Sequence, residues 1–383
     1  MKIIVAGGDG FCGWPTSLYL SKQGFDVAIV DNLVRREIDE ELNSNSLTPI
    51  ATIEERIAKW KELTGKEIEL FIGDLNDYDF LSEVFKTFKP EAFVHFAEQR
   101  SAPYSMIDRE HAVYTQSNNV LGNLNVLYAI KEFNPDCHLI KLGTMGEYGT
   151  PNIDIEEGYL EVEHKGRKET FLYPKSPGSF YHLTKVHDTN NIYFAVRSWD
   201  IRATDLNQGV VYGVNTAETK MDPVLVNRFD YDGIYGTVMN RFIIQTASGL
   251  PMSVYGKGGQ TRGFINIEDT VRCIELAALN PPERGDFKIY NQMTEQFSVL
   301  ELAEKVNEVA KKYFGLDGKI EHMENPRVEK EEHYFNAVIT KLKDLGLEAH
   351  LLTEEVIKDI MELAIENTDR VKLNNVMNSP SWR

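Results

Sequence analysis

Hydrophobic residues gather in short runs separated by helix-like polar stretches along roughly the first half of the chain. KIIVAG at the N-terminus is a β-branched run typical of a buried strand, and an apolar helical pattern through Leu18 and Leu20 follows it. The strand pattern recurs in FDVAIVDN, IELFIGDLND, AFVHFAEQR, HLIKLGTMGEYG and IRATDLNQGVVYG. Strands that alternate with helices in this way predict an α/β protein with a Rossmann-type doubly wound parallel sheet.

The pattern changes after Tyr212 to shorter, mixed elements, including a predicted strand pair in GKGGQTRGF and two helices toward the C-terminus. We therefore predict a first domain over residues 1–212 and a smaller α/β substrate lobe over residues 213–383, partly interleaved with the first. The tail KLNNVMNSPSWR shows no periodic pattern.

An unusually long segment, residues 32–67, is inserted after the second predicted strand. It contains one amphipathic helix pattern, carried by Ile53, Ile57 and Trp60. A segment with such a pattern is too structured for a linker, and it is expected to form a lid over a bound ligand or a dimer contact.

The composition narrows the classes of partner. The 383 residues are 42% hydrophobic and carry a formal net charge of -18, with a pI near 5.0. This charge disfavours nucleic acid and anionic membranes as partners, although a few local arginines could still hold a phosphate. Cys12, Cys137 and Cys273 form neither a disulfide framework nor a metal-binding spacing, and no metal is predicted. No stretch is long enough for a signal peptide or a membrane span, so a cytoplasmic location is expected.

Glycines follow the first strand directly, as Gly7, Gly10 and Gly13 in the order G-x-x-G-x-x-G. Such a loop permits close backbone approach to a pyrophosphate at a helix N-terminus. The next strand ends in Asp31, whose carboxylate would accept hydrogen bonds from the adenosine ribose hydroxyls. The order of strand, glycine loop, helix, strand and terminal acid predicts a dinucleotide site.

Asp31 favours NAD, since its carboxylate would repel the 2′-phosphate of NADP. Arg35 and Arg36 are near enough in sequence to bind such a phosphate, but they could equally grip the NAD pyrophosphate or face solvent. Asp74, at the end of the next strand, could meet the adenine. The predicted cofactor contacts are Gly7, Gly10, Phe11, Cys12, Gly13, Asp31, Asn32, Arg35, Asp74, Leu75 and Ala97, with Tyr181 and Lys185 described next.

Residues 181–185 read YHLTK, which places Tyr181 and Lys185 four positions apart. On a helix these residues would share one face, and the ammonium would favour the phenolate form of the tyrosine. A tyrosine tuned in this way can transfer a proton near neutral pH. Chance pairing on a solvated helix is the alternative, because the chain has 17 tyrosines.

The glycine loop, a threonine that closes a strand (Thr144) and Tyr-x-x-x-Lys together resemble the extended short-chain dehydrogenase/reductase family that acts on nucleotide sugars, over essentially the whole chain. The resemblance implies that Tyr181 moves a sugar hydroxyl proton, that Lys185 lowers its pKa and binds the nicotinamide ribose, and that Thr144 hydrogen-bonds the reacting oxygen. In sugar 4,6-dehydratases Asp-Glu follows this threonine, whereas Met145 and Gly146 stand here.

Any elimination chemistry must therefore use other groups, and Glu147 and His182 are the nearby candidates. Each has a structural alternative: Glu147 as a structural carboxylate, and His182 as a hydrogen-bonded wall residue.

Within this family the chain most resembles the members that add sulfite to UDP-glucose. DNLVRR, HFAEQRSAPYSM, LGTMGEYGTPNIDIEEG, YHLTK and GKGGQTRGFINIEDTV carry that resemblance. It implies NAD as the cofactor, UDP-glucose and sulfite as substrates, and a homodimer. The rival activities are a UDP-sugar 4-epimerase or dehydratase and, from another class, a catalytically silent NAD-binding redox sensor.

The same resemblance gives the substrate contacts. Arginines suit a nucleotide diphosphate because they are permanently charged and bind phosphate in bidentate fashion. Arg100 follows a strand at its carboxyl end and is expected to hold sulfite, unless it pairs with a neighbouring carboxylate and only shapes its loop. The predicted substrate residues are Arg100, Thr144, Gln208, Arg241, Gln260, Arg262 and Arg327.

Overall fold

A seven-stranded parallel sheet forms the centre of the first domain in the computed structural model, which describes residues 1–328, 334–377, 380 and 382. The strand order is β12-β8-β5-β4-β1-β2-β3, and every neighbouring pair is parallel, which confirms the predicted Rossmann-type fold. The strands are β1 (Lys2–Ala6), β2 (Asp26–Asp31), β3 (Ile68–Ile72), β4 (Ala92–His95), β5 (His138–Thr144), β8 (Arg202–Gln208) and β12 (Phe287–Gln292).

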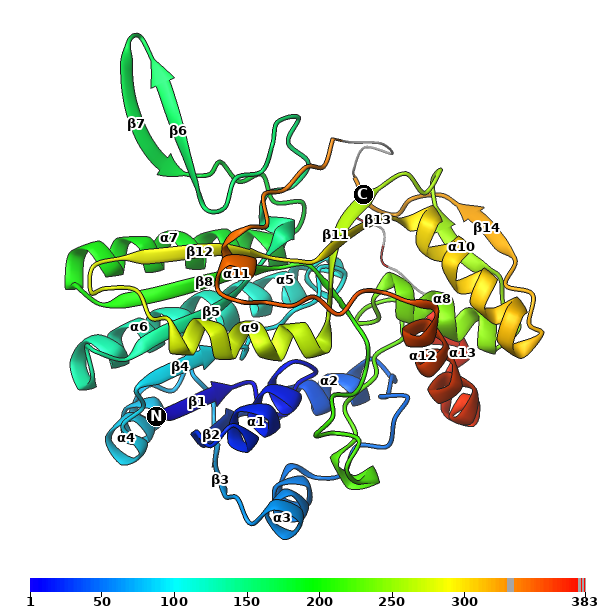
Figure 1. Ribbon diagram of the computed structural model, residues 1–383, viewed down its shortest axis with the longest axis horizontal. Helices are drawn as coiled ribbons and strands as arrows, with labels where there is room; N and C mark the ends of the chain where they lie inside the picture. Colours follow the sequence, from blue (N-terminus) through cyan, green and yellow to red (C-terminus); the bar gives the residue numbers. More distant parts are fainter. Residues whose placement is uncertain (329–333, 378–379, 381, 383) are drawn as a thin grey trace.

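Helices cover both faces of this sheet (Figure 1). Alternate residues of β1 point to opposite faces, so Ile3 and Val5 enter one hydrophobic core and Ile4 and Ala6 enter the other. The first core contains residues of α1 (Gly13–Lys22), α3 (Ile53–Thr64), α9 (Ile267–Leu279) and α11 (Lys341–Asp344), and the second those of α4 (Tyr78–Phe88), α6 (Gly122–Phe133) and α7 (Phe180–Trp199). α5 (Arg109–Gln116) contacts α7.

The second lobe has its own core around Phe242, Leu302 and Met361. Its sheets are β13-β11-β9 and β10-β14, so the strands that flank GKGG belong to different sheets and the predicted strand pair is wrong. The chain also returns to the first sheet through α9 and β12 before it completes this lobe (Figure 1). The elements are β9 (Val210–Tyr212), α8 (Val238–Ala247), β10 (Met252–Tyr255), β11 (Thr261–Asn266), β13 (Glu295–Ser298), α10 (Val299–Val309), β14 (Ile320–Met323), α12 (Glu354–Glu366) and α13 (Leu373–Val376).

The inserted segment forms α2 (Val34–Glu41) and α3, and α3 confirms the predicted amphipathic helix. Ile53 and Trp60 of α3 are buried against α1 and the sheet, while Ile57 is partly buried. A hairpin that sequence patterning did not predict, β6 (Tyr159–His164) and β7 (Arg167–Leu172), projects from the body of the protein (Figure 1). Among the helices that the structure describes, none is long and apolar enough to cross a membrane.

Candidate active site

A cavity of about 690 Å³ opens at the carboxyl edge of the seven-stranded sheet. Parallel strands bring their carboxyl ends to one edge, and the residues that follow β1, β2, β4, β5 and β8 all line this cavity. Residues of the second lobe form the opposite wall. The structure thus brings together every residue predicted for the site except Glu147, which does not line the cavity.

The glycine loop between β1 and α1 leaves no room for side chains. Gly7 has φ 83°, and a Cβ added to it would lie 2.8 Å from the backbone nitrogen of Ala97. A Cβ on Gly13 would lie 2.0 Å from the carbonyl oxygen of Gly7. The backbone is therefore bare where α1 begins, which fits the pyrophosphate of a dinucleotide.

Asp31 ends β2 and faces the cavity, as predicted. Its carboxylate accepts backbone hydrogen bonds from Leu33 (2.7 Å) and Asp9 (2.9 Å). Burial raises the pKa of Asp31 to about 6, and the charge of Asp9 acts in the same direction. Nearby, the amide of Asn32 donates to Asp74 (3.1 Å), so the predicted ribose and adenine contacts form one polar rim.

The arginines of the inserted segment are held by carboxylates. Arg36 binds Asp9 through two nitrogens at 2.7 and 2.9 Å, and Arg56 reaches the same carboxylate at 2.9 Å while its guanidinium lies 4.0 Å from the Trp14 ring centroid. Arg35 binds Asp39 (2.6 Å) and other groups described below. These arginines therefore bind carboxylates within the protein, and Arg36 and Arg56 connect the inserted segment to the glycine loop through Asp9.

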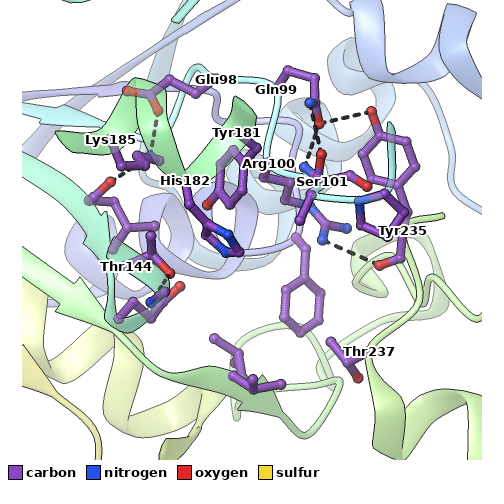
Figure 2. Close-up of a pocket in the computed structure, with 18 of the residues that line it drawn as sticks. Glu98, Gln99, Arg100, Ser101, Thr144, Tyr181, His182, Lys185, Tyr235 and Thr237 are labelled. Atoms are coloured by element: carbon purple, nitrogen blue, oxygen red, sulfur yellow. Dashed lines mark hydrogen bonds and ion pairs between the residues drawn. The ribbon is translucent and has the colours of Figure 1, made fainter. Parts of the chain in front are cut away.

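Helix α7 presents the tyrosine and lysine of YHLTK to the cavity. Its N-cap is Ser179, whose hydroxyl accepts a hydrogen bond from the backbone of His182 (3.2 Å). The Nζ atom of Lys185 lies 5.8 Å from the Tyr181 ring centroid, which confirms that the two residues share one face. This ammonium also donates to the carbonyl oxygen of Leu142 (2.6 Å) and forms an ion pair with Glu98 (Figure 2).

The pKa of the Tyr181 phenol is raised overall, not lowered as the sequence spacing predicted. Burial raises the pKa of Tyr181, and the charge of Glu98 raises it further, while Lys141 and Arg100 oppose them. Burial lowers the pKa of Lys185, against the attraction of Glu98. The spacing in the sequence predicts that the Lys185 ammonium lies near Tyr181. It cannot predict the burial of both groups or the Glu98 carboxylate that pairs with Lys185.

Thr144 ends β5 and lies beside the same space (Figure 2). Its hydroxyl accepts a hydrogen bond from the backbone of Gly146 (3.2 Å). The two candidates for elimination chemistry, Glu147 and His182, differ in their contacts. The carboxylate of Glu147 is fully buried, accepts from the Thr144 backbone (3.1 Å) and pairs with Lys175, so its contacts are those of the structural alternative.

His182 faces the cavity instead, next to Tyr181 (Figure 2). Its Nδ1 atom lies 3.0 Å from the Ser179 hydroxyl. Burial, with smaller contributions from Arg327 and Arg262, lowers the pKa of His182 to about 3, which keeps the imidazole neutral. A Cβ at Gly146 would lie 2.3 Å from its Nε2 atom, so this ring occupies the space that an acidic side chain after Met145 would need.

Arg100 combines the two alternatives drawn from the sequence. It lines the cavity with 36% of its side chain exposed, and it also pairs with Asp230. Its guanidinium lies 5.3 Å from the Tyr235 ring centroid. Asp230 is shared with Arg35 (3.0 Å) and Arg228 (2.9 Å), so three arginines surround one carboxylate.

On the lobe side, neutral groups hold Arg241. Its guanidinium donates to the hydroxyls of Ser253 (3.1 Å) and Tyr255 (3.0 Å). The amide of Gln260 donates to the Tyr255 carbonyl (3.4 Å), and Arg327 lies with its guanidinium 5.1 Å from the Trp382 ring centroid. Arg262, on β11, also lines this wall, whereas Gln208 lines the cavity from the end of β8.

Sequence reasoning missed several residues that line the cavity. Glu98 and Gln99 follow β4, and a charged residue directly after a predicted strand was a signal that could have been used. Tyr235 and Trp382 come from segments without periodic pattern, and only the fold brings them to the cavity. The missed residues are Asp9, Glu98, Gln99, Ser101, Tyr235, Thr237 and Trp382.

Comparisons with known proteins agree with this geometry. Residues 3–291 match the NAD dependent epimerase/dehydratase family. The chain is 58% identical over 382 residues to "UDP-sulfoquinovose synthase, chloroplastic" of Spinacia oleracea, covering 100% of this chain and 79% of that protein. It is 44% identical over 366 residues to "UDP-sulfoquinovose synthase" of Sulfolobus acidocaldarius, covering 94% and 93%.

Solved structures share the fold at lower identity. A UDP-glucose 4-epimerase from Thermus thermophilus, in complex with NAD, aligns with a TM-score of 0.66 at 23% identity, over 96% of this chain and 99% of that one. The enzyme of the same name from Thermotoga maritima, with UDP-glucose, aligns with a TM-score of 0.69 at 22% identity, over 95% and 98%.

Proposed function

The chain belongs to the NAD dependent epimerase/dehydratase family, and we propose that it makes UDP-sulfoquinovose from UDP-glucose and sulfite. The two relatives that carry this activity in their names match the chain over nearly its full length, in agreement with the resemblance drawn from its motifs. One observation in the site carries the proposal: Thr144, Tyr181 and Lys185 converge on a cavity where His182 fills the space of a dehydratase acid.

NAD is the cofactor of this family, and when bound it would supply the hydride acceptor for oxidation at C4 of the sugar and the hydride donor for the later reduction. The bare glycine loop and Asp31 would hold its pyrophosphate and adenosine ribose. Lys185 would reach the nicotinamide ribose.

Tyr181 acts on the C4 hydroxyl. In the proposed reaction its phenolate form takes the hydroxyl proton as C4 is oxidised, and the resulting phenol gives that proton back when C4 is reduced. Thr144 donates a hydrogen bond to the same oxygen and fixes its position. The C4 ketone then acidifies the proton on C5, because the carbanion that forms there is conjugated with the carbonyl.

We assign the elimination from C5 and C6 to His182. Its neutral imidazole faces the cavity and can move a proton, whereas Glu147 is occupied by protein partners. Loss of the C5 proton and the C6 hydroxyl releases water and leaves a 4-keto-5,6-ene. Bisulfite adds across this alkene, with sulfur bonding to C6 and a proton returning to C5. Overall, a C6 hydroxyl is exchanged for a sulfonate and one water is released.

Cations in the cavity serve the two anionic substrates. Arg100 is our candidate for sulfite, because its planar fork matches two sulfite oxygens and part of it remains exposed to the cavity. Arg241, Arg262 and Arg327 are the candidates for the diphosphate of the nucleotide sugar, with Gln260 beside them.

We also propose a homodimer and a cytoplasmic location, following the resemblance and the composition. The word "chloroplastic" in the name of the spinach protein describes that protein. Light scattering during size-exclusion chromatography measures the assembly directly.

The proposed function is tested by adding substrates one at a time. UDP-glucose alone should produce reduced-nicotinamide absorbance in the NAD-loaded protein, and a Tyr181→Phe variant is the matched control. A silent redox sensor would give no absorbance change. UDP-galactose formed at the same rate with and without sulfite would instead assign an epimerase.

A further inference from the structure

A cluster of buried charges lies directly behind the catalytic pair. Glu98 follows β4, Lys141 lies within β5, and Lys185 and Asp188 lie on α7. The side chains of Glu98, Lys141 and Asp188 are each 1% exposed, and that of Lys185 is 4% exposed. Glu98 forms ion pairs with both lysines, and Lys141 also reaches Asp188 at 3.1 Å.

We propose that Glu98 is a positioning residue that fixes the ammonium of Lys185 and sets the electrostatic environment in which Tyr181 exchanges protons. This inference rests on the proposed function only as far as the C4 oxidation step.

The position of the Lys185 side chain depends on Glu98. The flexible four-carbon chain of Lys185 is fixed by two polar contacts, the Leu142 carbonyl oxygen (2.6 Å) and the Glu98 carboxylate, and its ammonium lies 5.8 Å from the Tyr181 ring centroid. A long lysine side chain loses substantial rotamer entropy when it is fixed. An ion pair made inside the protein supplies that constraint before any ligand binds (Figure 2).

Lys185 lies in a cluster of opposite charges. It is faced by Glu98 from the segment after β4, Lys141 from β5 and Asp188 from its own helix, while the Nε2 atom of His95 lies 3.7 Å from the carboxylate of Glu98. Burial lowers the pKa of His95 to about 3, so this imidazole contributes no positive charge. Glu98 is thus the carboxylate in direct contact with the catalytic ammonium.

Tyr181 experiences the same groups. Apart from burial, the largest effects on the pKa of its phenol come from the charges of Glu98 and Glu147, which raise it, and of Lys141 and Arg100, which lower it. Substituting Glu98 removes the largest of these charge effects on Tyr181, and it leaves the positive charge of Lys185 without its carboxylate partner. Both changes favour the phenolate, so the pKa of Tyr181 should fall and the pH profile of C4 oxidation should move to lower pH.

The test compares Glu98→Gln with Asp188→Asn. Glu98→Gln removes the carboxylate that contacts Lys185, whereas Asp188→Asn changes a buried carboxyl group whose pKa is raised by burial and leaves the Glu98–Lys185 ion pair in place. Reduced-nicotinamide formation from UDP-glucose is followed against pH without sulfite. We expect Glu98→Gln to move the profile to lower pH by about 1 unit. This is the lower end of the pKa shifts that a charge within ~4–6 Å causes. Asp188→Asn should move it by less than half as much.

A second readout needs neither substrate nor turnover. Ultraviolet difference titration of each variant against its own Tyr181→Phe derivative reports the ionisation of Tyr181 alone, and calorimetry with NAD checks that each variant binds the cofactor. An unchanged Tyr181 titration in a folded Glu98→Gln protein would overturn the proposal, as would equal displacement in the two variants.

Should Glu98→Gln fail to fold, Glu98→Asp keeps the charge and withdraws it from Lys185 by one methylene. Its pH profile should move in the same direction by a smaller amount, and a profile and rate equal to wild type would contradict the proposal. A wild-type protein that oxidises UDP-glucose but ignores sulfite would sink the proposed function, yet it would leave this test fully informative.

Discussion

The two walls of the cavity compensate their positive charges in different ways. On the sheet side, Lys185 faces Glu98, and Arg100 faces Asp230. On the lobe side, Arg241 is held by the hydroxyls of two neighbouring residues, and it makes no ion pair with any residue that the structure describes. These sheet-side cations are therefore each paired with a carboxylate, whereas Arg241 on the lobe side keeps a positive charge that an anion can match.

This difference suits the two kinds of work. Proton transfer needs groups held in place before the substrate arrives, and ion pairs within the protein do so. A diphosphate carries its own negative charge, so a guanidinium held by neutral hydroxyls keeps its attraction for the ligand. A protein with a net charge of -18 needs such a local cation to bind a nucleotide sugar.

The largest expected effect lies in the proton-transfer group of the sheet wall. Tyr181→Phe removes the phenol hydroxyl and leaves the surrounding ion pairs intact, so turnover should fall by about 10² to 10⁴. NAD affinity, measured by calorimetry, should stay near the wild-type value. A variant that keeps more than half of the wild-type rate would remove Tyr181 from the reaction.

The second effect tests whether the sheet wall is truly self-compensated. Asp230→Asn would leave the largely buried Arg228 and Arg35 with only Asp39 as a shared carboxylate. Breaking a buried ion pair from one side costs about 3–5 kcal/mol, and a loss of that size in the free energy of unfolding is expected in denaturant titration. A matched Arg241→Gln change should cost much less, and equal losses would erase the distinction between the walls.

The third effect tests the lobe wall directly. Arg241→Ala should weaken the binding of UDP by about 10- to 100-fold, which corresponds to about 1.5–3 kcal/mol for hydrogen bonds to a charged group. Calorimetric titration with UDP measures it, and Arg167→Ala on the exposed hairpin is the control for lost surface charge. Unchanged UDP affinity in Arg241→Ala would show that the diphosphate binds elsewhere.

The smallest effect is expected at Arg100, since Asp230 already compensates part of its charge. Arg100→Ala should raise the KM for sulfite by about tenfold, which is near the low end of the free energy that a hydrogen bond to a charged group contributes. NAD affinity and C4 oxidation of UDP-glucose should persist. If NAD binding, stability and every step decline together, Arg100 only shapes its loop; an unaltered sulfite dependence excludes it from the site.

More of the sheet wall than of the lobe wall could be predicted from local sequence motifs. The glycine loop, Asp31, Thr144 and the Tyr181–Lys185 pair each depend on a short motif whose geometry is set within one loop or one helical turn. The sequence could therefore place them at a common edge of a parallel sheet. The substrate arginines of the lobe came from the family resemblance rather than from their own patterns.

Properties that depend on distant segments could not be predicted. The return of β12 to the first sheet and the separation of β10 from β11 follow from long-range strand pairing. The rise in the pKa of Tyr181 follows from burial and from Glu98, on another strand end. Sequence patterns offered no reason to prefer Glu147 or His182 as the proton-transfer group. In the structure Glu147 pairs with Lys175, whereas His182 contacts the N-cap Ser179 of α7 and faces the cavity.

The proposed reaction is tested by mass spectrometry and NMR of UDP-glucose incubated with the NAD-loaded protein and sulfite in deuterated water. The account predicts a UDP-sugar in which the C6 hydroxyl is replaced by a sulfonate, with a solvent deuterium at C5 and no net consumption of NAD. Unchanged UDP-glucose, UDP-galactose, or a sulfonated product that keeps its original C5 hydrogen would contradict it.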